Sequence, residues 1–115
     1  LKRSIMRVEL SSVGNPDFGQ NPNESLWGAE ENRIVEVATF EDASFECMKF
    51  ISENDLGGGN WSGGDVFNEH GARIAYVSYN GRVWELGKDG DRYGGAEIKI
   101  DISSVINKIV ELNKR

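Results

Sequence analysis

The sequence predicts an α+β domain in which a mostly antiparallel sheet of five or six strands carries two helices. Three observations predict this class. Short runs of β-branched residues alternate with polar ones, two longer segments repeat apolar residues at helical spacing, and an Asn-Gly pair separates two β-rich runs. The expected order is β-β-α-β-β-β-β-α, folded into two layers. A chain of 115 residues has the length of a single domain, residues 1–115.

The first half predicts two strands and one helix. Alternation predicts strands over residues 4–10 and 33–40, joined by a long loop that contains two Asn-Pro pairs and several glycines. The helix is expected over residues 42–54, with either Thr39 or Asp42 as its N-cap. Its apolar spacing places Cys47 on the face that packs against the core.

A short loop is expected to follow this helix. We expect Gly57 to end the helix over residues 42–54, in a left-handed C-cap.

The second half predicts four strands and a closing helix. The strands are expected over residues 64–69, 72–79, 82–86 and 96–102. Asn80 and Gly81 predict a two-residue type I′ hairpin turn, because both central residues of that turn need a positive φ. The helix is expected over residues 102–113, capped by Asp101 and with an apolar face.

The predicted strand over residues 72–79 is apolar on both faces. Such a strand is either central and covered on both sides, or it meets a partner with one face. We therefore expect a homodimer as one outcome.

Charge is unevenly distributed along the chain. The net charge is −6, but residues 8–60 hold 11 acidic and 2 basic side chains, so this segment alone carries −9. An acidic field disfavours nucleic acid as a partner and favours either a solvated face or a surface for a basic protein. An acidic inhibitor of DNA-binding enzymes, similar to antirestriction proteins, is one alternative function.

Cysteine usage and hydropathy bear on the compartment. Cys47 is the only cysteine, which leaves no partner for an internal disulfide and fits the cytoplasm. No apolar run approaches the ~20 residues of a membrane helix, so no membrane partner is expected.

Motifs for catalysis, metals and cofactors are missing from the sequence. The stretch LGGGNWSGGD, residues 56–65, lacks the Lys-Ser or Lys-Thr of a phosphate loop, and a helix precedes it where a strand is needed. The stretch DGDRYGG, residues 89–95, lacks the glutamate that closes a calcium loop. One His and one Cys cannot build a tetrahedral zinc site within one chain. We expect no cofactor and no metal.

A small enzyme that uses loop carboxylates is a further alternative. Its candidate residues are Glu30, Glu31, Asp65 and Glu69.

Aromatic residues form the best candidate site. Several lie in loops or on the predicted hairpin, where they could hold a small cationic or aromatic molecule. The candidate ligand-binding residues are Trp27, Trp61, Tyr76, Tyr79, Trp84 and Tyr93. The alternative is that these side chains fill the second face of the sheet. For Trp61 both interpretations stay open: it anchors a glycine-rich connector on the core, or it meets a ligand together with Trp27.

In length, acidity and compactness the chain resembles the short orphan proteins of mobile elements, such as integron gene cassettes and phage genomes. The resemblance covers no motif and assigns no residue, but it implies an accessory binding role. The leading hypothesis is therefore a non-catalytic, cytoplasmic binding protein for a small molecule or a basic protein partner.

Overall fold

The computed structural model describes residues 5–114 and contains one antiparallel sheet of six strands, in the order β2-β1-β3-β4-β5-β6. The strands are β1 (Met6–Leu10), β2 (Arg33–Val37), β3 (Asp65–Phe67), β4 (Arg73–Val77), β5 (Val83–Glu85) and β6 (Glu97–Ile98). The helices are α1 (Phe40–Glu53) and α2 (Ile102–Asn113), and three 3-10 turns are η1 (Pro16–Phe18), η2 (Gly58–Asn60) and η3 (Lys88–Gly90). The predicted α+β class and element order are confirmed. Residue 4, where the first strand was expected to begin, lies outside the described residues.

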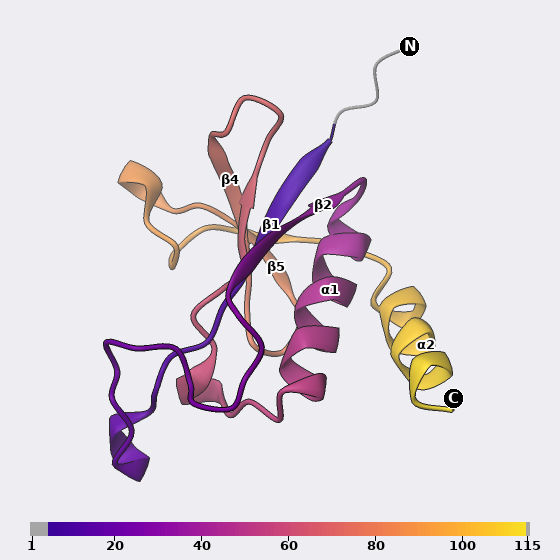
Figure 1. Ribbon diagram of the computed structural model, residues 1–115. Coiled ribbons are helices and arrows are strands. Elements are labelled where there is room, and N and C mark those ends of the chain that lie inside the picture. The colour runs from indigo at the N-terminus through magenta and orange to yellow at the C-terminus, as the bar shows by residue number, and fades with distance from the viewer. Residues whose placement is uncertain (1–4, 115) are drawn as a thin grey trace.

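The two helices lie on one side of the sheet, and the loop with η3 lies on the other (Figure 1). Strand register aligns Val8, Val66 and Ala75 in one row on the helix side, where all three are buried. Cys47 and Phe50 of α1 join the same core, so the predicted inward face of this helix is confirmed. Burial of such apolar surface is the main force that holds the two layers together.

Both ends of α1 are defined by local hydrogen bonds. Thr39 is the N-cap, since its side chain accepts a hydrogen bond of 3.0 Å from the Asp42 N–H, and the helix begins two residues earlier than predicted. The prediction for Gly57 is wrong. Asp55 adopts the left-handed conformation (φ 52°), and Leu56 N–H bonds Ile51 O in a Schellman arrangement. The helix has therefore already ended before the glycines begin.

The β4–β5 turn differs from the predicted type I′. Gly81 has a φ of 86°, whereas Asn80 is not among the residues of positive φ. Gly81 N–H bonds Ser78 O, and Ser78 N–H bonds Arg82 O, which makes a three-residue loop with a bulge at the glycine. An Asn-Gly pair fits this turn as well as the type I′ turn, so the pair alone does not determine the loop length.

Helix α2 lies beside α1 and packs mainly against it. Asp101 is its N-cap as predicted, with a 3.2 Å bond from Ser104 N–H to its carboxylate. The predicted apolar face is buried only in part: Val105 is fully buried, but Ile102, Ile106 and Val110 are exposed. The helix turns part of its apolar surface to solvent because its main neighbour is another helix rather than the sheet. Neither helix of residues 5–114 is long and apolar enough to cross a membrane.

Candidate ligand-binding site

The glycine-rich connector between α1 and β3 is anchored by Trp61. This side chain is 8% exposed, its ring centroid lies 6.2 Å from that of Phe50, and its indole N–H donates to Val77 O at 3.2 Å. The connector also accepts a 2.8 Å hydrogen bond at Leu56 O from the Tyr79 hydroxyl. Trp61 therefore ties the connector to the end of β4, Tyr79 ties it to the turn that follows, and Trp61 belongs to the core.

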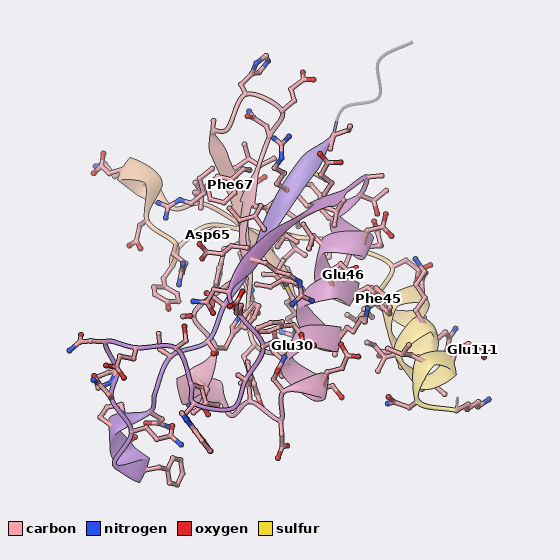
Figure 2. All side chains as sticks on the ribbon, in the orientation of Figure 1. Glu30, Phe45, Glu46, Asp65, Phe67 and Glu111 are labelled. Atoms are coloured by element: carbon pink, nitrogen blue, oxygen red, sulfur yellow. The ribbon has the colours of Figure 1, made fainter. Side chains whose placement is uncertain are left out.

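The face of the sheet opposite the helices carries a row of polar and aromatic side chains. The antiparallel register places Asp65 of β3 opposite Tyr76 of β4, and Tyr76 opposite Trp84 of β5. Figure 2 shows Asp65 and Phe67 on this face, with Phe45 and Glu46 of α1 on the other side of the sheet. No helix of the described chain covers this row, so its partners come from a loop.

The β5–β6 loop, residues 86–96, folds back over Tyr76. The Arg92 guanidinium lies 4.6 Å from the centre of the Tyr76 ring, and the Tyr93 ring meets it edge-on with centroids 5.9 Å apart. Gly95 allows this path, because a Cβ there would lie 1.9 Å from Glu85 O. Arg92 and Tyr93 of the same chain thus cover the Tyr76 side chain, which is buried. The apolar residues of β4 therefore do not by themselves require a homodimer.

These elements border an open pocket of about 600 Å³. Its lining residues are Tyr76, Ser78, Tyr79, Asn80, Trp84, Arg92, Tyr93, Gly94 and Gly95. Tyr76 and Tyr79 are three positions apart, so in a regular strand their side chains would point to opposite faces. They nevertheless line one pocket, because β4 ends at Val77 and Tyr79 lies in the turn. The volume falls in the range of small-molecule sites.

A chain of hydrogen bonds fixes the rim of the pocket. The Trp84 indole N–H donates to Ser78 Oγ at 3.1 Å, and Ser78 Oγ donates to Asn80 Oδ1 at 2.6 Å. Arg82 N–H also donates to Asn80 Oδ1, at 3.2 Å. Two donors on one oxygen orient the Asn80 amide, so the group left for a ligand is its NH₂.

Asp65 and Arg92 form an ion pair next to the pocket, and Arg92 is one of its lining residues. Arg92 Nη2 donates to Asp65 Oδ2 at 3.0 Å, and Arg73 Nη1 lies 3.9 Å from the same oxygen. The second Asp65 oxygen is buried and has no hydrogen-bond partner among the described residues. Burial acts to lower the pKa of Arg92, but the bond and the charge of Asp65 outweigh it and raise that pKa, so the guanidinium stays charged.

Two further groups of this face titrate abnormally. Burial raises the pKa of Glu9, and the charge of Asp65 raises it further. Burial likewise raises the pKa of the Tyr76 hydroxyl, with Tyr93 adding to the shift. Both shifts reflect a face that is partly withdrawn from water although no helix lies on it.

The six predicted ligand-binding residues divide into two groups. Four line the pocket: Tyr76, Tyr79, Trp84 and Tyr93. The other two do not, since Trp61 is in the core and Trp27 is 96% exposed in the loop before β2. Sequence reasoning missed Arg92. The only signal for it was its position directly before Tyr93 in a turn-rich loop.

The carboxylates of the enzyme alternative are not among the residues that line this pocket; they are Glu30, Glu31, Asp65 and Glu69. Glu30 pairs with Arg33 at 3.1 Å, Glu69 lies 3.5 Å from the exposed His70, and Asp65 is separated from the pocket by Arg92. Cys47 is fully buried, and burial raises the pKa of its thiol. Within residues 5–114, no three His, Cys, Asp or Glu side chains gather as metal ligands would.

The chain matches no protein-family model, no curated protein and no solved structure. The pocket is therefore the only feature of the described residues from which we infer a function.

Proposed function

We propose that this protein binds a small aromatic molecule in the pocket on the open face of its sheet. One observation carries the proposal: four aromatic side chains from β4, the turn, β5 and the β5–β6 loop meet at a single pocket of about 600 Å³. Flat apolar walls with a few oriented polar groups are typical of sites for aromatic ligands. The free, buried Cys47 fits a cytoplasmic setting for this role.

Charge favours an aromatic ligand over a cationic one. The lining residues include Arg92 and no carboxylate. A cation that entered would face the guanidinium, whereas the nearest carboxylate, Asp65, is not among the lining residues and is already bonded to Arg92. Of the two ligand classes expected from the sequence, the aromatic one is therefore the better fit.

A second depression, of about 720 Å³, lies between α1 and α2. It offers one aromatic side chain, Phe45, and otherwise mostly polar residues. Its Lys108 already bonds Asp42 at 3.3 Å. This groove therefore supports no comparable ligand proposal.

The acidic segment supports a basic partner or a DNA-binding enzyme less well than the pocket supports a ligand. Several of its carboxylates have local cationic partners. The pairs are Glu30 with Arg33, Glu36 with Arg7, and Asp42 with Lys108. These paired carboxylates lie on a strand, a loop and a helix. A surface that imitates DNA phosphate would instead need a continuous row of unpaired acids.

Titration with 2-naphthylmethanol tests the proposal. We expect saturable binding, followed by NMR, and much weaker binding of its fully hydrogenated analogue, which has no π-face. Tyr93 is 68% exposed, so Tyr93→Ala should fold and bind less tightly. Trp27→Ala removes an exposed aromatic residue outside the pocket and should bind as the natural chain does. Equal binding of both compounds, or equal loss in both variants, would contradict the proposal.

A further inference from the structure

From the unused donors of the pocket we infer that its ligand is an aromatic molecule that carries a carboxylate or similar anion, held by Arg92. This inference rests on the proposed aromatic pocket and names the chemical class of its ligand. The aromatic walls select a ring, whereas the groups described next select a charge.

Arg92 has donors to spare. A guanidinium has five N–H groups in a planar fork. Arg92 donates from Nη2 to Asp65 and also bonds the Tyr93 side chain, so N–H groups remain for a ligand. The cation also stacks on Tyr76 and lines the pocket. Stacking and the Asp65 bond hold its plane, so a second carboxylate would meet a preoriented fork.

Asp65 keeps a cation even when Arg92 bonds a ligand. Arg73 lies 3.9 Å from the same Asp65 oxygen, and Arg73 is itself held by a bond to Gly90 O on the β5–β6 loop. Two arginines, Arg73 and Arg92, therefore lie near the Asp65 carboxylate. Glu9, a second acid, is partly buried close to the same group. If Arg92 bonds both Asp65 and a ligand, the Asp65 carboxylate still has Arg73 beside it. A buried carboxylate without a cation would be costly, so this second arginine allows Arg92 to take part in binding.

The remaining polar groups of the pocket include a free amide donor beside the Arg92 cation, while the Tyr76 and Tyr93 hydroxyls can both donate and accept. The Trp84 and Tyr79 donors are used within the chain, and the Asn80 oxygen accepts two bonds, so the Asn80 NH₂ remains. A donor amide and a cation, with no acid among the lining residues, match an anion. The net charge of the chain is −6, so this selectivity must act at short range, where salt screens little.

Three probes with one ring system test the inference: 2-naphthoate, 2-naphthylmethanol and 2-naphthylmethylammonium. We expect 2-naphthoate to bind roughly ten-fold more tightly than the alcohol, as a charge-assisted bond predicts, and the ammonium most weakly. Arg92→Met keeps an apolar stem over Tyr76 and should bring naphthoate and alcohol to nearly equal affinity. Lys88→Met removes an exposed cation of the same loop and should keep the preference.

The possible failures are distinguishable. If the alcohol binds but naphthoate binds no better, or if Arg92→Met keeps the preference, the anion is wrong and the aromatic pocket stands. If none of the three probes binds, the pocket itself is wrong. Should Arg92→Met unfold because Asp65 loses its partner, the double variant Asp65→Asn, Arg92→Met removes both charges and carries the same expectation.

Discussion

Replacing Trp61 with Phe tests whether the glycine-rich connector is anchored on the core. The indole of Trp61 is almost fully buried, packs on Phe50 and donates a hydrogen bond to Val77 O. Phe keeps one ring at this position and removes both the donor and the second ring. The variant therefore isolates the two contributions that tie the connector to the end of β4.

The expected cost is the sum of two parts. An acceptor left without its donor in a buried place costs about 1–2 kcal/mol. The lost ring atoms, with the cavity that they leave, cost about 1–2 kcal/mol more. We expect Trp61→Phe to lower the free energy of unfolding by about 2–4 kcal/mol, or roughly 8–15 °C in Tm for a domain of this size.

Urea denaturation followed by circular dichroism measures this cost. Trp27→Phe, at an exposed site, is the matched control and should change stability by less than about 0.5 kcal/mol. In a Trp27→Phe, Trp84→Phe protein, the fluorescence of the remaining Trp61 should resist quenching by acrylamide. Equal stability of the Trp61 and Trp27 variants, or strong quenching of Trp61, would refute the anchor.

Three further variants test other parts of the structure. Glu9→Gln should raise Tm at neutral pH and leave it unchanged near pH 3. An acid with a raised folded pKa costs stability once it ionises, and this cost is absent well below the ordinary carboxyl pKa, where both states are protonated. An equal gain at both pH values would contradict this. Thr39→Ala should cost about 1 kcal/mol in urea denaturation, while Thr39→Ser, which keeps the hydroxyl on Asp42 N–H, should cost little; equal losses would rule out the cap. The exposed Ile102, Ile106 and Val110 lie on successive turns of α2, and we expect them to meet in a homodimer that Ile106→Glu converts to monomer. Sedimentation of the natural chain as a monomer at tens of micromolar would reject the dimer.

Most of the fold could be predicted from local patterns in the sequence. Alternation and helical spacing identified all six strands and both helices, because these periods reflect which side chains face the core. Asp101 was recognisable as a cap because its effect is confined to the next three residues. Where two local solutions fit one motif, the prediction went wrong, as for the turn at Asn80 and Gly81 and for the end of α1 at Asp55.

The pocket depends on contacts between distant parts of the chain. The predicted two-residue turn would pair Val77 with Trp84 and place Tyr76 on the opposite face. The three-residue loop shifts the register by one residue, and this shift makes Tyr76 and Trp84 neighbours. The approach of Arg92 to Asp65 joins residues 27 positions apart through a loop without periodicity, so no pattern predicted it. Trp27 and Trp61 looked alike in the sequence, since both lie in glycine-containing loops. Only tertiary packing buries one and exposes the other.

The proposed function requires an aromatic ligand to bind in the pocket beside Trp84. Titration of ¹⁵N-labelled protein with 2-naphthoate tests it most directly, because the three indole N–H signals report three environments in one spectrum. Trp84 lines the pocket, Trp61 is buried in the core and Trp27 is exposed elsewhere. We expect a saturable shift of the Trp84 signal while that of Trp27 stays in place. A Trp84 signal that does not move, or equal shifts of both, would contradict it.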